Sequence, residues 1–166
     1  MSTTLRTIGQ VDRAIQILLC LLMVFLVIDV SWQVVTRFIL PEPSSYTEEI
    51  ARFLLIWIGL LGAAHAYRSR MHLGIDIISE KLQGRSKTTA TLFVYLVCAV
   101  FAIAVLIIGG LNLVLLTLEL KQASASLGVR MGLVYLCLPL SGLLIVLYTL
   151  EMVINHYSNK NHPRGR

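Results

Sequence analysis

Four long apolar runs constrain this chain more than any other feature of its sequence. They cover about residues 15–39, 50–67, 88–118 and 129–154. A helix needs about 20 apolar residues to cross the hydrocarbon core of a bilayer, and it satisfies its own backbone hydrogen bonds where water is absent. The runs therefore predict an all-α integral membrane protein with four transmembrane helices. The third run is longer than a span requires, so we expect it to tilt or to project.

The composition agrees with a membrane-embedded chain. Of the 166 residues, 57% are hydrophobic and 14% are charged, whereas soluble domains are about 45–50% apolar and about 25% charged. We expect one membrane domain over residues 1–166, ending in a polar tail at 155–166. The net charge of +5 comes from residues that flank the runs, which favours contacts with lipid headgroups. No basic face interleaved with aromatic residues is present, so nucleic acid is not expected as a partner.

The distribution of basic residues predicts the orientation. An even number of spans places both termini on one side of the membrane, and ten of the 14 Lys and Arg residues then fall on that side. The positive-inside rule makes this side the cytoplasm. The loops near residues 42 and 124 are therefore expected to face outward, and both termini inward.

The segment between the second and third spans has a helical pattern of its own. Apolar residues recur at Met71, Ile75, Ile78 and Leu82, which is typical of an amphipathic helix lying in the membrane interface. We expect this helix over about residues 71–83. His72 and Asp76 are four residues apart and are expected to pair along it.

Charged residues gather where the first span ends and the second begins. Part of this charge is explained by a capping box at the start of the second span and by the positive end of its helix dipole. An acidic side chain inside a span is costly and usually faces a partner. We therefore predict an outward-facing polar cluster, in which Arg52 pairs with Glu48 or Glu49 on its own helix or makes an inter-helix contact with Asp29. Its members are Asp29, Arg37, Glu48, Glu49 and Arg52.

Two further features of the spans concern packing. Small residues four apart let helices approach closely in lipid, and the second span carries such steps at Gly59, Gly62, Ala63 and Ala66. These four residues are predicted to form a helix-packing seam. Pro139 lies within the fourth span, where a proline removes a backbone donor and kinks the helix.

No catalytic or cofactor chemistry is predicted. The sequence contains no zinc-ligand spacing, nucleophile motif or phosphate-binding loop. A membrane haem requires paired histidines, and of the four histidines only His65 lies in a span. We therefore expect neither an enzyme nor a bound cofactor or metal.

The order of these features resembles the small, four-span membrane subunit of tripartite ATP-independent periplasmic (TRAP) transporters, the DctQ-like family. The resemblance covers about residues 13–154, and the third span contributes little to it. It is carried by Arg37, Tyr46-Thr47-Glu48-Glu49-Ile50-Ala51-Arg52, Trp57, Gly59-Leu60-Leu61-Gly62-Ala63-Ala64, Arg68, His72-Leu73-Gly74-Ile75-Asp76, Leu127-Gly128-Val129 and Pro139.

The resemblance implies a role in a bacterial inner membrane. Such systems import organic acids, among them sialic acid and C4-dicarboxylates, on a sodium gradient. A periplasmic binding protein captures the solute, and a large multi-span subunit moves it by an elevator-like mechanism. The small subunit is then a scaffold without a transport site, which braces the large subunit and helps to receive the binding protein.

Two other functions are compatible with parts of the sequence. A standalone proton-coupled exporter would use Asp29 as its coupling acid, but the interfacial helix and the outward-facing charges argue against it. A membrane anchor for a redox enzyme would need the paired histidines that the spans lack.

Overall fold

The computed structural model describes residues 2–39, 45–69 and 85–161. These residues form the helices α1 (Ser2–Ile39), α2 (Ser45–Arg68), α4 (Arg85–Phe101), the π-helix η1 (Ala102–Gly109), α5 (Gly110–Glu119), α6 (Met131–Tyr135) and α7 (Cys137–Asn161). Within the described ranges, the β-structure is a single bridge between Ala123 and Arg130. The chain is thus all-α, as the sequence predicts.

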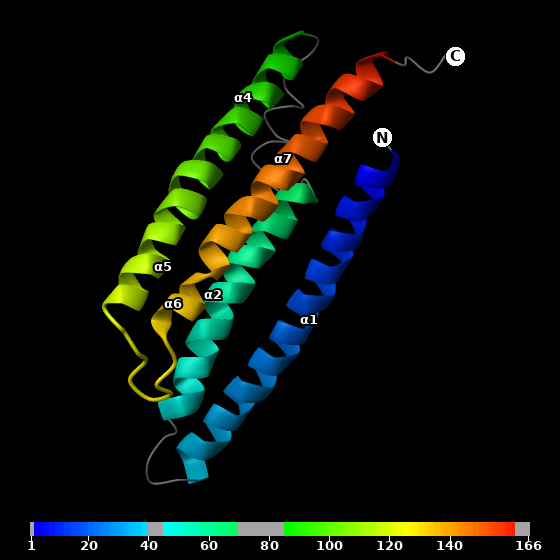
Figure 1. The fold of residues 1–166 in the computed structure, drawn as a ribbon. Helices are drawn as coiled ribbons and strands as arrows, with labels where there is room; N and C mark the ends of the chain where they lie inside the picture. Colours follow the sequence, from blue (N-terminus) through cyan, green and yellow to red (C-terminus); the bar gives the residue numbers. More distant parts are fainter. Residues whose placement is uncertain (1, 40–44, 70–84, 162–166) are drawn as a thin grey trace.

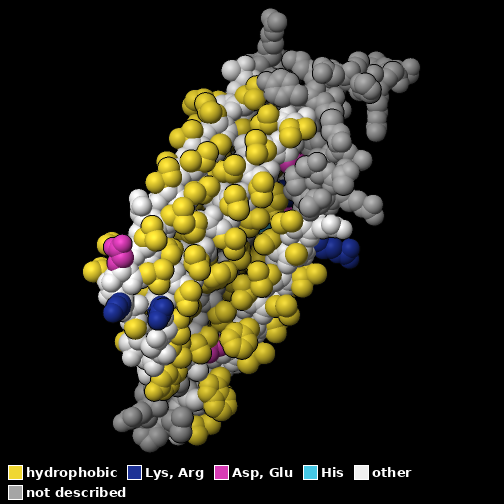
Figure 2. Space-filling view, in the orientation of Figure 1, with side chains coloured by type: hydrophobic (Ala, Val, Ile, Leu, Met, Phe, Trp, Pro, Cys, Tyr) yellow, Lys and Arg dark blue, Asp and Glu magenta, His cyan; other side chains and the backbone are white. Residues whose placement is uncertain are grey.

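The helices form an elongated antiparallel bundle (Figure 1). We call the end at which α1 begins and α7 ends the terminal end. The opposite end, where α1 ends, α2 begins and residues 120–130 connect α5 to α6, is the loop end. The helices long and apolar enough to cross a membrane are Gly9–Ile39, Ser45–Arg68, Thr89–Glu119 and Met131–Ile154. Apolar side chains cover most of the face seen in Figure 2, as expected for a surface in contact with lipid.

Two segments predicted from the sequence, at about residues 71–83 and 155–166, are described to different extents by the structure. The amphipathic helix expected at about residues 71–83, with His72 and Asp76, lies outside the described residues. Of the polar tail expected at residues 155–166, residues 155–161 are helical, because α7 continues to Asn161. The helix can continue this far because no helix-breaking residue occurs between Asn155 and the proline at position 163.

The apolar core lies toward the terminal end. It joins α2 and α4 to α7 through Leu61, Ala64, Tyr67, Tyr95, Leu144, Tyr148 and Met152. The first span is peripheral by comparison: 6% of its most apolar 18-residue stretch is buried within the chain, against 39% for the fourth span. In Figure 1, α1 lies along α2 at the side of the bundle. The fourth span is therefore the centre around which the others pack.

The third and fourth spans pack closely against each other at two glycines. A Cβ atom added to Gly142 would lie 2.8 Å from the Leu106 Cβ, and one added to Gly110 would lie 2.9 Å from the Leu138 Cβ. The buried residues Ala102, Leu106 and Gly110 follow at intervals of four. Residues four apart are neighbours on the surface of a helix. The Ala102 carbonyl and Leu106 lie beside Gly142, and Gly110 lies beside Leu138 and Pro139, so this face of the third span is turned toward α7.

The fourth span is interrupted one turn before Pro139. The helix stops at Tyr135 and resumes at Cys137, with Leu136 between the two parts. Pro139 has no backbone N–H with which to continue the ladder to Tyr135. The interruption is where the sequence leads us to expect one.

Among the described residues, the seam predicted on α2 makes no close packing contact at Gly59 or Gly62. Gly59 and Ala63 are exposed, and Gly62 and Ala66 are only partly buried. A Cβ added to Gly59 or Gly62 would meet nothing within 4 Å. The face of α2 that packs against the rest of the chain carries Ala51, Leu61, Ala64 and Tyr67 instead.

Candidate functional site

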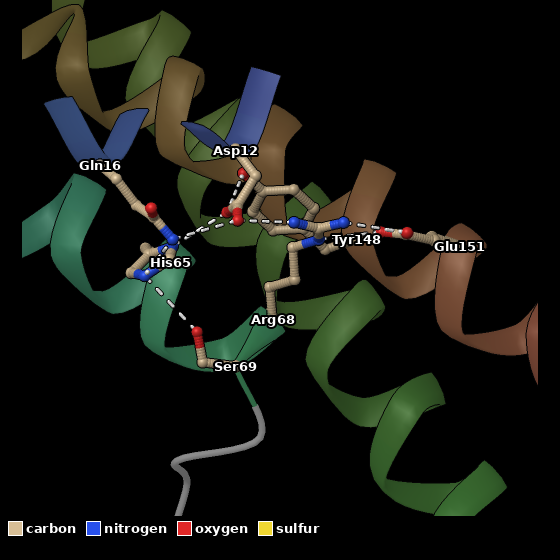
Figure 3. Close-up of polar contacts among 7 residues, drawn as sticks. All are labelled: Asp12, Gln16, His65, Arg68, Ser69, Tyr148 and Glu151. Atoms are coloured by element: carbon tan, nitrogen blue, oxygen red, sulfur yellow. Dashed lines mark hydrogen bonds and ion pairs between the residues drawn. The ribbon is translucent and has the colours of Figure 1, made fainter. Parts of the chain in front are cut away.

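The most connected polar site lies at the terminal end. We call it the terminal-end network, and Figure 3 shows that its side chains converge from α1, α2 and α7. Each of these helices brings a charged group to the same depth of the bundle. The members are Asp12, Gln16, His65, Arg68, Tyr148 and Glu151.

Arg68 stands between two carboxylates. Its Nη1 lies 2.6 Å from Asp12 Oδ2, and its Nε and Nη2 donate to the two carboxylate oxygens of Glu151, each at 3.0 Å. The guanidinium carbon also lies 5.3 Å from the centre of the Tyr148 ring. Such two-pronged charged hydrogen bonds are among the strongest side-chain contacts, and this one ties α2 to both α1 and α7.

Asp12 is the second hub of the network. Its Oδ1 lies 2.9 Å from His65 Nδ1 and accepts a hydrogen bond from the Tyr148 hydroxyl at 3.3 Å. Its Oδ2 also accepts from Gln16 Nε2 at 3.4 Å. The side chain of Asp12 is 12% exposed and that of Arg68 is 22% exposed. The network thus satisfies mostly buried charges, which would otherwise be costly in an apolar bundle.

At the loop end, Glu49 holds the connection between the third and fourth spans. One of its carboxylate oxygens accepts hydrogen bonds from the backbone N–H groups of Ser126 at 3.1 Å and Leu127 at 2.9 Å. The loop is itself closed by a hydrogen bond from the Ser124 N–H to the Val129 carbonyl at 2.9 Å. Glu49 therefore anchors a folded loop to the start of α2.

Asp29 makes a smaller contact between α1 and α2. The Gln33 side-chain amide donates to Asp29 Oδ2 and to the Thr47 carbonyl, each at 2.9 Å. Asp29 is 8% exposed, so its charge is buried beside an amide from the next turn of its own helix. Gln33 is the residue that connects the two helices here.

The structure separates the five residues expected in the outward-facing cluster. Asp29 contacts Gln33, Glu49 contacts the loop, and Arg52 lies 3.9 Å from Glu48 in an exposed pair within α2. Arg37 is exposed on α1. The expected ion pair between Asp29 and Arg52 is not formed in the described part of the chain, because nearer groups already contact each of them.

Sequence reasoning did not identify Asp12 or Glu151. A usable signal was present, because Asp12, Arg68 and Glu151 all fall near the same end of their spans in a four-helix topology. Opposite charges at matched depths on neighbouring helices indicate an ion pair. The rotation of each helix, which brings the three together, is not visible in a single sequence.

The middle of the bundle differs from both ends. Residues 14–28, 53–64, 89–118 and 131–150 contain no charged side chain. Among the described residues, no group of three or more His, Cys, Asp or Glu side chains is arranged to hold a metal ion. The charged contacts of the described helices are thus confined to the two ends.

Comparison with known proteins identifies the family. The family described as "Tripartite ATP-independent periplasmic transporters, DctQ component" matches residues 26–159. The chain belongs to the DctQ family. Members of this family are permease components of transporters and not enzymes, which places the chain in the bacterial inner membrane as a multi-pass protein.

Characterised relatives are similar over much of the chain. The sialic acid TRAP transporter small permease protein SiaQ of Vibrio cholerae is 28% identical over 139 residues, covering 81% of this chain and 76% of the relative. The C4-dicarboxylate TRAP transporter small permease protein DctQ of Rhodobacter capsulatus is 27% identical over 107 residues, covering 64% and 47%. The isethionate TRAP transporter permease protein DctMQ of Oleidesulfovibrio alaskensis is 34% identical over 102 residues, which are 61% of this chain but 16% of that protein.

Proposed function

We propose that this DctQ-family chain is a scaffold subunit that carries no solute itself. It braces the large elevator-type subunit of a sodium-coupled TRAP transporter and helps to dock the periplasmic binding protein. Its termini and terminal end face the cytoplasm, and its loop end faces the periplasm. The transporter imports an organic acid of the sialic acid or C4-dicarboxylate type.

The uncharged middle of the bundle carries this proposal. Secondary transporters bind solute and coupling ions near the midplane, where several polar groups and unwound helix ends converge. Here the charged residues of the described helices lie at the ends, and their contacts join the chain's own helices to one another. A bundle held in this way is suited to remain fixed while a neighbouring subunit moves.

The exposed seam on α2 supports a membrane partner. Gly59, which has no side chain, and Ala63, which has a methyl group, are both exposed, and such a surface allows another helix to approach closely in lipid. The relative named DctMQ has a matched segment that makes up 16% of a much longer permease. We place the large subunit against this seam, formed by Gly59, Gly62, Ala63 and Ala66.

The loop end supports the docking role. Arg37, Glu48 and Arg52 are exposed there, while Asp29 and Glu49 fix the helices and the loop beneath them. Exposed charges at a rim steer partners more than they stabilise a fold. We propose that Asp29, Arg37, Glu48, Glu49 and Arg52 together position the surface that meets the binding protein.

Co-purification and uptake together test the proposal. An affinity-tagged chain should retain a large multi-span subunit after extraction in mild detergent. Sodium-driven uptake into liposomes should require that subunit and the binding protein as well. Uptake or proton-coupled export by this chain alone, abolished by Asp29→Asn, would overturn the scaffold role and favour the exporter. A Gln33→Leu variant is a matched control, because it removes the Asp29 hydrogen bond without removing the acid.

A further inference from the structure

A cavity of about 430 Å³ opens at the loop end, where the third and fourth spans meet their connecting loop. It lies beside the last turn of α5 and the residue that precedes α6. Its lining combines apolar, polar and basic residues. The lining residues are Thr117, Leu118, Lys121, Gln122, Ala123, Gly128 and Arg130.

The loop holds two basic residues beside this cavity in a fixed backbone. Lys121 has a φ of 48°, a conformation that residues other than glycine adopt rarely. The Gln122 N–H donates to the Thr117 carbonyl, and the Gln122 carbonyl accepts from the Met131 N–H, both at 3.0 Å. A bridge between Ala123 and Arg130 closes the loop. Lys121 and Arg130 therefore line one cavity although nine positions separate them.

Neither basic side chain is neutralised by the described part of the chain. Both are exposed, and the ion pairs among the described residues are made by other side chains. Glu49 contacts Ser126 and Leu127, which do not line the cavity. Glu119 is exposed two residues before Lys121 and does not line it either. The cavity thus presents two positive charges available for a ligand.

The depth of the cavity in the bundle indicates the source of an anion. The third span ends at Glu119 and the fourth begins at Met131, so Lys121 and Arg130 stand at the level of the lipid headgroups. Below them, Leu115 and Leu133 are 57% and 53% exposed on the apolar surface. A ligand with an anionic head and apolar tails matches both parts of this surface.

We propose that this cavity binds the phosphate group of an anionic phospholipid from the leaflet at the loop end. Lys121 and Arg130 contact the phosphate oxygens, Leu118 contacts the glycerol region, and the acyl chains follow the exposed apolar face of α5 and α6. This inference does not depend on the scaffold function, since it concerns a lipid site within this chain alone.

Lipid retention tests the proposal. The chain would be reconstituted with phosphatidylglycerol and phosphatidylethanolamine, re-extracted in mild detergent and examined by native mass spectrometry. We expect phosphatidylglycerol to be retained preferentially, and the K121Q/R130Q double variant to retain it about thirtyfold less well. R37Q/R52Q is a matched control that removes two exposed positive charges at the same end and should leave retention unchanged. The K121R/R130K variant should keep it, which separates loss of charge from loss of fold.

Three results would overturn the proposal. The first is equal retention of both lipids by the unaltered chain. The second is equally tight binding of glycerol phosphate, which has no acyl chains and represents a soluble phosphate source. The third is loss of the bound lipid when the chain is purified with a protein partner, because the cavity would then be a protein contact.

Discussion

The two ends of this bundle hold charges in opposite ways. At the terminal end, Arg68 joins carboxylates from two other helices in a mostly buried network. At the loop end, Arg52 and Glu48 pair within one helix, with side chains 65% and 74% exposed. A buried charge that loses its partner is strongly destabilising, whereas an exposed pair contributes about 0–1 kcal/mol. The first arrangement fixes the fold, and the second leaves charge available to other molecules.

The largest expected effect is therefore at Arg68. Replacing it by Met leaves Asp12 and Glu151 mostly buried without their cation, and we expect a loss of about 3–5 kcal/mol in the free energy of unfolding. Thermal or denaturant unfolding in detergent would measure it. The triple variant R68M/D12N/E151Q should recover part of the loss, because the repulsion between the carboxylates is removed as well. A stability loss at Arg68 no larger than that of R52Q would remove the distinction between the ends.

At the loop end, the Glu49 carboxylate makes the main contact between α2 and the loop that joins α5 to α6. E49A removes the carboxylate that accepts from the N–H groups of Ser126 and Leu127, and only the Leu127 N–H keeps a second acceptor, the Ser124 hydroxyl at 3.2 Å. We therefore expect the loop to be less stable, because the Ser126 N–H loses its charged acceptor. Hydrogen exchange should become faster at the Ser126 amide, less so at the Leu127 amide, and should change little near Tyr148. E48A is the control, because Glu48 contacts only the exposed Arg52 in the described structure. Equal protection of the loop amides from hydrogen exchange in E49A and E48A would contradict the anchoring role of Glu49.

Two glycines, Gly142 and Gly59, differ in how closely other residues pack around them. G142A places a methyl group 2.8 Å from the Leu106 Cβ, and overpacking of this kind costs about 1–3 kcal/mol. G59A has open space around it and should be neutral or slightly stabilising, because alanine favours helix. Unfolding of the isolated chain would measure both. A bulkier G59L variant should instead reduce co-purification of the large subunit while leaving the isolated chain as stable as before.

The sequence predicts the spans well because each span depends on a continuous length of apolar residues and not on contacts with residues distant in the sequence. The sequence places Asp12, Arg68 and Glu151 near one end of their spans, but the contacts among them depend on the rotations of three helices, which the sequence does not define. For Asp29 the sequence suggests a partner on another helix, Arg52. In the structure its hydrogen bond comes instead from Gln33, one turn away on the same helix. The π-helix at Ala102–Gly109 lies in a uniformly apolar run, where hydrophobic periodicity contains no signal for a wider turn.

The smallest expected effect on stability is at Arg52, and it separates folding from docking most sharply. R52E reverses the charge opposite Glu48 in an exposed pair, so the free energy of unfolding should change by about 1 kcal/mol or less. If the loop end meets the binding protein, the same variant should slow uptake by the reconstituted transporter and alter its dependence on salt, because rim charges act mainly on the rate of association. R13E, at the terminal end and likewise exposed, is the matched control for both measurements. Equal uptake by R52E and R13E at low salt would show that Arg52 does not take part in docking, even if the fold behaves as expected.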